Sequence, residues 1–144
     1  MLIIAGDLFL ETFSILRRCG AKRRECQVLW LSAPSADQIT AVRHSKHHST
    51  AASLEVDPTW LNDLWFTLIR EGFSIRAQIH THGGAAWHSE TDDAYPIIGT
   101  PGFVSVVVPR FALLPPSLEQ LYVTTIQSNG GWCESTPREV IRIV

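Results

Sequence analysis

Two histidines at the end of a predicted strand are the residues best suited to chemistry. His80 and His82 are separated by a single residue. Because side chains alternate across a strand, this spacing places both imidazoles on the same face. Two imidazoles on one face can bind one ion at metal–nitrogen distances of about 2.0–2.1 Å. Such a pair by itself often serves only for hydrogen bonding, so the expectation of a metal depends on further ligands.

A carboxylate that would complete a metal site follows after a turn. Two glycines end the strand, and Ser89, Thr91 and Asp92 then resemble the start of a helix. Asp92 would complete a His-His-Asp ligand set, and three protein ligands leave the fourth tetrahedral position to water, as in catalytic zinc sites. Ser89 or Asp92 can instead cap the helix.

An open zinc site also requires a base. The ion lowers the pKa of its water to about 7, and a nearby carboxylate can take the proton and return it to a leaving amine. Glu25 is the best candidate because it begins a strand that can run beside the histidine pair. Glu11 lies on a predicted helix, and Glu55 lies beside a helix start. A lone glutamate is otherwise most often a surface charge.

The other histidines receive weaker assignments. His44, His47 and His48 could form a second metal site, but the sequence supplies no carboxylate at a fixed spacing. We therefore expect the stretch from His44 to Ser53 to be a solvated or substrate-facing loop. His88 lies in the connection after the histidine pair and could hydrogen-bond to a ligand.

The cysteines remain unassigned. Cys19, Cys26 and Cys133 cannot all pair within the chain, and no Cys-x-x-Cys motif is present. Neither a disulfide scaffold nor a four-cysteine zinc site is therefore expected, and a reducing cytoplasm is the simplest setting.

Periodicity and chain breakers predict the elements that position these residues. Two helices are expected, with apolar faces directed into the core, and the stretches between them alternate or form continuous apolar runs typical of strands. The predicted helices are 7–19 and 57–72, the strands are 25–31, 38–43, 74–82, 103–108 and 121–127, a short helix begins near Thr91, and Pro109 to Ser117 is a loop. This order predicts an α+β fold with a mixed β-sheet and helices packed on it.

Net charge and the length of the apolar runs argue against some classes of function. A chain of 144 residues fits one domain, 1–144, and its net charge of −2 argues against charge-driven binding of nucleic acid. The longest apolar run is too short for a membrane span, and the opening run lacks the basic start of a signal peptide. We therefore expect a cytoplasmic protein with no nucleic-acid or membrane partner.

The motif set resembles that of a known family. Glu25 ahead of an apolar strand, His80-x-His82 and Ser89-x-x-Asp92 resemble the JAMM motif of the JAB/MPN metalloproteases, and in particular the small stand-alone prokaryotic JAB-domain peptidases. The resemblance runs from the first helix to the strand near Val108. It implies the mixed sheet between helices of the JAB/MPN, cytidine-deaminase-like architecture.

The sequence departs from the family pattern in two places. Gly83 stands where the family usually has proline, which we expect to loosen the loop without removing a ligand. Six residues rather than the usual seven separate His82 from Ser89. Asp92 keeps the Ser-x-x-Asp relation and is preferred, whereas Asp93 would keep the usual distance from the second histidine.

The resemblance implies a zinc isopeptidase or peptidase that cleaves after the C-terminal tail of a ubiquitin-like protein. One Zn²⁺ per chain would be held by His80, His82 and Asp92. Glu25 would deprotonate the water and protonate the leaving lysine amine, and Ser89 would donate a hydrogen bond to the tetrahedral oxyanion. Two alternatives within the family remain: a peptidase that trims a sulfur-carrier protein, and a catalytically silent scaffold.

The resemblance also suggests partners. The tail of a ubiquitin-like protein binds such enzymes as an added β-strand, and segments 44–53 and 109–120 match the family's guiding insertions. Phe111, Leu113 and Leu114 are apolar loop residues that suit either partner contact or a folded-back plug. Activating (E1-like) and conjugating (E2-like) enzymes encoded in the same operon would be further partners, with antiviral defence as one setting.

Overall fold

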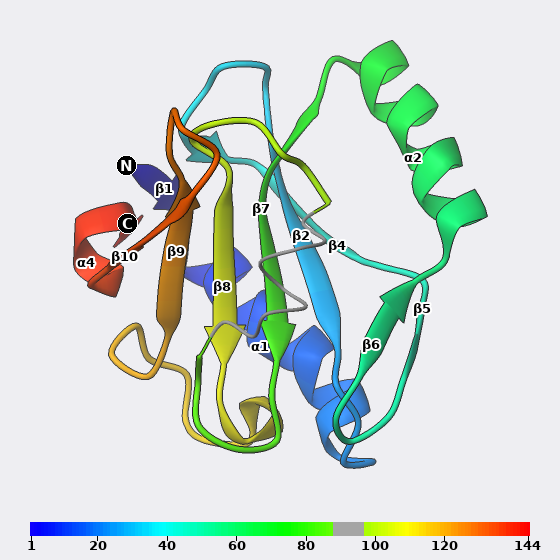
Figure 1. Ribbon diagram of the computed structural model, residues 1–144, viewed down its shortest axis with the longest axis vertical. Helices are drawn as coiled ribbons and strands as arrows, with labels where there is room; N and C mark the ends of the chain where they lie inside the picture. Colours follow the sequence, from blue (N-terminus) through cyan, green and yellow to red (C-terminus); the bar gives the residue numbers. More distant parts are fainter. Residues whose placement is uncertain (88–96) are drawn as a thin grey trace.

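A mixed sheet forms the centre of the computed structural model, which describes residues 1–87 and 97–144 (Figure 1). Within these residues the main sheet has the strand order β10-β9-β8-β7-β2-β4. The bounds are β2 Gln27–Ser32, β4 Ala41–His44, β7 Ser74–Thr81, β8 Val104–Val108, β9 Tyr122–Ile126 and β10 Trp132–Ser135. β7 and β8 pair in parallel, and the other neighbours pair antiparallel. The predicted α+β class with a mixed sheet is confirmed.

Both long helices form where the sequence predicts them. Helix α1 spans Gly6–Gly20, and helix α2 spans Pro58–Glu71. Asp57 caps α2 by accepting a hydrogen bond of 2.9 Å from the Trp60 N–H, which holds the pKa of this carboxyl below its usual value. Gly72 follows α2 with φ of 75°, the left-handed conformation that favours glycine at a helix end.

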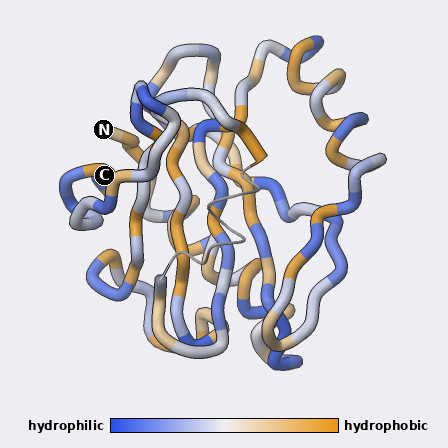
Figure 2. Tube along the Cα trace, in the orientation of Figure 1, coloured by the Kyte–Doolittle hydropathy of each residue, from blue (hydrophilic) through white to orange (hydrophobic). Residues whose placement is uncertain are grey.

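The two faces of the sheet bury different helices. Alternation along β2 directs Val28 and Trp30 into the core with α1, whereas Leu29 and Leu31 pack in the core under α2. Figure 2 shows apolar residues concentrated along the central strands. All six residues of β2 are buried, because helices cover this strand on both sides.

The helical spacing of apolar residues in α2 predicts a core-facing stripe, which is correct only in part. The stripe is Leu61, Leu64, Trp65, Leu68 and Ile69. Leu64 and Leu68 are buried, and Leu61 and Trp65 are partly buried. Ile69 is 75% exposed, so its assignment to the core is wrong. It follows Leu68 by one residue, which turns its side chain about 100° around the helix axis and away from the sheet.

Three features were not predicted from the sequence. The opening strand β1, Leu2–Ile4, pairs in parallel with β11, Ile141–Ile143, and with β3, Gln38–Ile39. The predicted strand 38–43 is therefore divided, because only its second half, in β4, pairs with β2. A short helix α4, Pro137–Val140, precedes β11.

The stretch from His44 to Ser53, predicted as a loop, instead contains the end of β4, the strand β5 and the turn of a hairpin. His44 closes β4, and β5, His47–Ser49, pairs antiparallel with β6, Leu54–Val56. The loop prediction is wrong because backbone pairing orders a segment whose side chains show no hydrophobic period. After β8, residues Arg110–Ala112 form the short 3-10 helix η1, in which Phe111 has φ of 54°.

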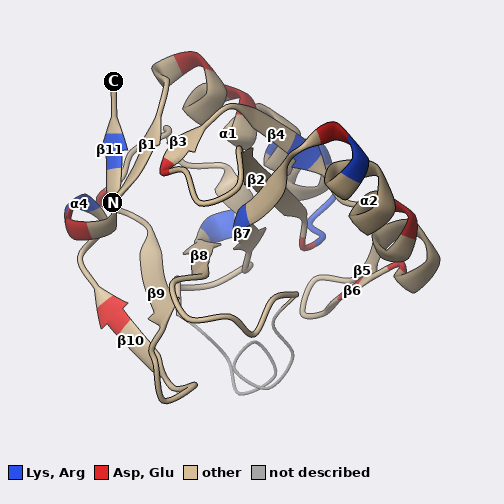
Figure 3. Cartoon of the chain, turned by 90° about the horizontal axis from the view of Figure 1, so that it is seen from above, with Lys and Arg blue, Asp and Glu red and all other residues tan. Residues whose placement is uncertain are grey.

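Charged residues of both signs are distributed over many elements, as Figure 3 shows for the view from above. This distribution fits the small net charge of −2. Within residues 1–87 and 97–144, none of the helices combines the length and apolar character that a membrane crossing requires.

Candidate active site

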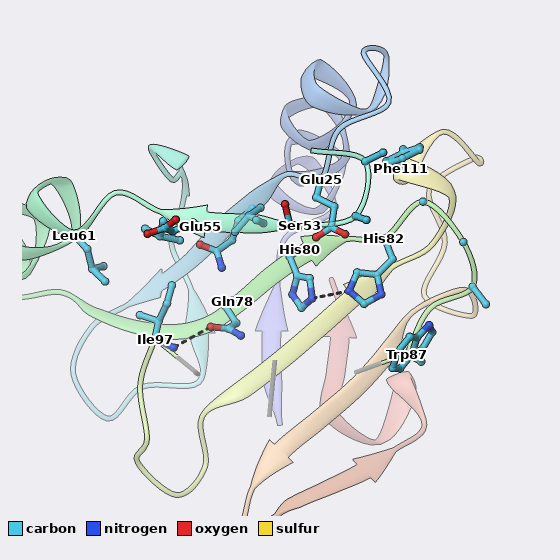
Figure 4. A pocket seen from close by; sticks show the side chains of 18 residues that line it. Glu25, Ser53, Glu55, Leu61, Gln78, His80, His82, Trp87, Ile97 and Phe111 are labelled. Atoms are coloured by element: carbon cyan, nitrogen blue, oxygen red, sulfur yellow. Dashed lines mark hydrogen bonds between the residues drawn. The ribbon is translucent and has the colours of Figure 1, made fainter. Parts of the chain in front are cut away.

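The structure brings Glu25, His80 and His82 together. β2 and β7 pair antiparallel with Gln27 opposite His80, so continuing the same register places Glu25 opposite His82. Alternate residues share a face, and all three side chains therefore lie on the α2 side of the sheet. Figure 4 shows the Glu25 carboxylate directed toward the two imidazoles, with all three residues lining one pocket.

The geometry of the histidine pair fits a shared metal ion. The Nε2 atoms of His80 and His82 are 3.2 Å apart. Two imidazole ligands on one tetrahedral ion lie about 3.3 Å apart when each metal–nitrogen distance is about 2.0–2.1 Å. His80 is buried, and His82 is partly exposed toward the pocket. The predicted placement of both imidazoles on one face is thus what the structure shows.

Glu25 is held in place by its backbone. Its N–H donates a hydrogen bond of 2.9 Å to the carbonyl of Thr50 in the hairpin. The next residue, Cys26, donates its N–H to Thr81 Oγ1 at 2.8 Å and accepts the Thr81 N–H at 3.1 Å. The segment that carries the predicted base is therefore hydrogen-bonded, through Cys26, to Thr81, the residue between the two histidines.

The pocket has a volume of about 1040 Å³. The sheet supplies its polar floor, including Gln27 and Gln78, and hairpin residues 51–56 form one wall. Glu55, to which the sequence assigns no role, is an exposed residue of β6 and also lines this wall. A cleft of this size with few convergent polar groups is typical of a ligand site.

The exit of β7 is held by contacts with the chain after β8. The His82 N–H donates to the Val108 carbonyl at 3.0 Å, and the Phe111 N–H donates to the His82 carbonyl at 2.9 Å. A Cβ on Gly83 would lie 2.6 Å from the Phe111 Cζ atom. The expected loosening by Gly83 stays a prediction. What the structure shows is that the glycine admits the Phe111 ring between the backbone hydrogen bonds of His82 and Gly84.

Of the apolar residues after β8, Phe111 is only 8% exposed and is a folded-back plug. Leu113 and Leu114 are 51% and 44% exposed, so these two remain available for contact with a partner. Of the predicted guiding segments, 44–53 supplies part of the pocket wall, whereas 109–120 contributes Phe111.

Several predicted site residues lie in the segment 88–96, outside the described residues. They are the proposed oxyanion donor Ser89, the third ligand Asp92 with its alternative Asp93, His88, and the predicted helix start at Thr91. The flanking residues are described. The Trp87 ring lies edge-on to His82 with centroids 5.9 Å apart, and the Ile97 N–H donates to Gln78 Oε1 at 3.2 Å.

A second group of metal-type side chains combines His44 and His47, which the sequence offers as possible ligands, with Cys19 and Cys26, which the sequence leaves unassigned. The ligand atoms of Cys19, Cys26, His44 and His47 all lie within 4.8 Å of one another. Burial raises the pKa of the Cys26 thiol, with a smaller contribution from Cys19, and burial lowers the pKa of the His44 imidazole. The sequence separates these residues into Cys-x6-Cys and His-x2-His pairs, and only the folding of the chain brings the two pairs together.

Comparison with known proteins gives the family. The chain is 31% identical over 136 residues, covering 90% of this chain and 83% of the relative, to a Sinorhizobium fredii protein named "Probable metalloprotease y4jG". No family model matches the chain. The separation of the His80 and His82 Nε2 atoms suits a bound metal ion, which agrees with the name of this relative.

Two solved structures share the fold. Protein DSY2949 from Desulfitobacterium hafniense superimposes with a TM-score of 0.71 at 15% identity, covering 100% of this chain and 93% of that chain. A Salinibacter ruber protein gives a TM-score of 0.60 at 13% identity, covering 93% of this chain and 88% of that chain. At these low identities the two structures show only a shared fold. The Sinorhizobium fredii protein, in contrast, is similar in sequence over most of the chain. The chain therefore belongs to the metalloprotease family of that relative.

Proposed function

We propose that the pocket containing Glu25, His80 and His82 is the active centre of a JAMM-type zinc peptidase that cleaves after the C-terminal tail of a ubiquitin-like protein. The observation that carries the proposal is the meeting of the three residues in one pocket, with the two imidazole Nε2 atoms 3.2 Å apart. Membership in a metalloprotease family supports the same chemistry.

His80 and His82 would hold the zinc ion together with Asp92. Trp87 and Ile97, the described residues on either side of segment 88–96, both line the pocket, which supports a third ligand from that segment. When bound, the ion would polarise the scissile carbonyl and lower the pKa of the attacking water. Three protein ligands suit a catalytic rather than a structural zinc site.

Glu25 would act as the base and then as the acid. Its carboxylate would take a proton from the attacking water and later deliver it to the leaving amine of a lysine side chain or a peptide. Its carboxylate is directed toward the histidine pair, and its backbone is hydrogen-bonded to the hairpin, so little reorientation is required. Ser89 would donate a hydrogen bond to the oxyanion of the tetrahedral intermediate.

The hairpin offers a place for an extended substrate tail. The hydrogen bonds from Asp57 N–H to the Lys46 carbonyl and from Thr50 N–H to the Ser53 carbonyl fix which pairs of the β5–β6 ladder are bonded. By the alternation of an antiparallel pair, the backbone groups of Leu54 and Val56 point away from β5. β6 lines the pocket, so a tail that added to this edge would lie beside the histidines.

The proposed partner is a ubiquitin-like protein or its conjugates, with activating and conjugating enzymes of the same operon as further partners. A tail bound through main-chain hydrogen bonds needs no strong electrostatic attraction, which fits the net charge of −2. Neighbouring genes for sulfur metabolism would instead favour trimming of a sulfur-carrier protein.

The test is hydrolysis of a panel of ubiquitin-like proteins, each carrying either a linear C-terminal fusion or an isopeptide-linked lysine peptide. We expect zinc-dependent cleavage after the tail, and a loss of roughly 10²–10⁴-fold in Glu25→Gln. Wild-type rates in Glu25→Gln would overturn the role of Glu25. Zinc-dependent hydrolysis of unrelated peptides, with the whole panel left uncut, would overturn the substrate class.

A further inference from the structure

We propose that Cys19, Cys26, His44 and His47 form a second metal site, closed and four-coordinate, which binds a zinc-type dication and holds the segment that carries Glu25. This site lies apart from the histidine pair, and it does not depend on the proposed peptidase activity. Two thiolates and two imidazoles are the ligand set of many structural zinc sites.

The distances between the four side chains suit one tetrahedral ion. Cys26 Sγ lies 3.3 Å from His44 Nε2, and Cys19 Sγ lies 3.6 Å from His47 Nε2. Cys19 Sγ also lies 4.0 Å from His44 Nε2, and all four ligand atoms lie within 4.8 Å of one another. In a tetrahedral site with bonds of about 2.3 Å to sulfur and about 2.0–2.1 Å to nitrogen, the sulfur–nitrogen separation is about 3.6 Å. The Cys26–His44 and Cys19–His47 separations are therefore close to the value that an ion would impose.

The tautomer of His47 supports metal binding. Its Nδ1 lies 2.8 Å from the Ser45 carbonyl, which can only accept a hydrogen bond. Nδ1 therefore carries the proton, and in the neutral imidazole the Nε2 lone pair is directed toward Cys19. A ring that donates one N–H to a backbone carbonyl and offers its other nitrogen is the usual arrangement of a metal-binding histidine.

The backbone around the two cysteines is ordered by its own hydrogen bonds. The carbonyl of Cys19 accepts the N–H groups of Lys22 and Arg24 at 2.9 and 3.2 Å, which closes the turn between helix α1 and Glu25. The carbonyl of Gln27 accepts the N–H of Ser45 at 3.2 Å, which joins the β2 and β4 ends. The four ligands are thus held close together by contacts that do not involve the ion.

The competing interpretation is a disulfide between Cys19 and Cys26. A disulfide would leave two imidazole nitrogens directed at sulfur atoms that neither donate nor accept strongly. Cys26 is fully buried, and Cys19 is partly buried. An ion shared by all four side chains accounts for the positions of the imidazoles as well as those of the sulfurs.

The position of this site explains what the ion would do. Its ligands come from the end of α1, the residue directly before β2, the end of β4 and the start of β5. Cys26 immediately follows Glu25, and His47 begins the hairpin whose turn accepts the Glu25 N–H. Binding of the ion would therefore fix both the proposed base and the pocket wall, because metal binding stabilises the segments it links.

The experiment is zinc X-ray absorption on the full-length protein, purified under reducing conditions and loaded with Zn²⁺. The His80→Ala variant leaves only the second site to be observed. We expect two sulfur ligands at about 2.3 Å and two nitrogen ligands at about 2.0–2.1 Å. Zinc without sulfur ligands, absence of bound zinc, or a Cys19–Cys26 disulfide found by mass spectrometry would overturn the proposal.

A matched pair of cysteine variants supplies the second measurement. Wild type should bind about two zinc ions per chain, Cys19→Ser should lose one of them, and Cys133→Ser, which changes an exposed cysteine, should lose none. Equal zinc content in Cys19→Ser and Cys133→Ser would contradict the proposed ligands. If Cys19→Ser does not fold, the absorption spectrum of His80→Ala still decides. Loss of the catalytic zinc alone would leave the sulfur signal intact, so the two proposals fail separately.

Discussion

Glu25 and Cys26 are consecutive residues whose surroundings differ completely. Glu25 faces a pocket that contains the histidine pair, whereas Cys26 is buried on the α1 side beside another thiol and two imidazoles. Alternation along the segment that leads into β2 thus directs one residue to each of the two groups. The pocket group offers nitrogen and oxygen atoms beside a cavity, and its proposed three-ligand site leaves one coordination position to water, whereas the cysteine group offers two sulfurs and two nitrogens that together complete a tetrahedral shell. Openness permits a reaction, and closure favours structural stability.

The largest effect is expected from removal of a pocket ligand. His80→Ala should abolish metal-dependent hydrolysis of a ubiquitin-like fusion, with a loss above roughly 10³-fold, because the ion that activates the water would no longer be held. Thermal unfolding should change much less than in a cysteine-site variant, which differential scanning calorimetry would measure. If His80→Ala kept the zinc ion of the pocket as well as its activity, the pocket site and the cysteine site could no longer be distinguished.

The next effect should appear in stability. Cys26→Ser should lower the unfolding temperature by roughly 6–12 °C, which corresponds to about 3 kcal/mol in a chain of this size. Cys133→Ser is the matched control, because Cys133 is exposed on β10 and outside the group. Equal unfolding temperatures for the two serine variants in the presence of zinc would show that the cysteine group has no structural role.

A smaller effect is expected at the exit of β7. Gly83→Ala should destabilise the protein by about 1–3 kcal/mol and lower activity, because the new methyl group would overlap the Phe111 ring beside His82. Gly84→Ala should leave both nearly unchanged, since a Cβ there meets nothing within 4 Å. Chemical denaturation of the two variants provides the measurement, and an equal response would refute the close contact.

The smallest effect concerns the substrate-binding edge. Leu54→Pro removes a backbone N–H that points away from β5 and would bond to the substrate tail. Loss of this one hydrogen bond costs about 0.5–1.5 kcal/mol and should raise KM by roughly 2–12-fold. Metal content and the cysteine site should be unaffected. Steady-state kinetics on the ubiquitin-like fusion would measure this change, and a fall in kcat at constant KM would argue against strand addition at β6.

The sequence was most informative where a pattern is local. Asp57, Pro58 and Gly72 mark the ends of α2 correctly, and the one-residue spacing of His80 and His82 correctly places both rings on one face. The sequence favours Glu25 as the base because the strand that it precedes can pair with that of the histidines, and β2 and β7 do pair in this way.

The sequence was uninformative where the geometry depends on pairing over long distances. The cysteine group joins residues from four elements, and its spacings differ from those of common zinc motifs. The β1–β11 pairing links the two ends of the chain, and the β5–β6 hairpin has polar side chains without a period. Phe111 takes a left-handed conformation that its residue type does not favour, and local sequence therefore does not predict it. Its contact with Gly83 depends on tertiary packing.

The most direct test of the two-site account is stepwise removal of zinc by a chelator, with hydrolysis of a ubiquitin-like fusion and sulfur-ligated zinc measured in the same samples. The open site should lose its ion first. We predict that activity disappears while the sulfur signal and the folded state persist, and that added zinc restores activity. Activity that survives complete removal of zinc, or that declines only with the sulfur signal, would contradict the account.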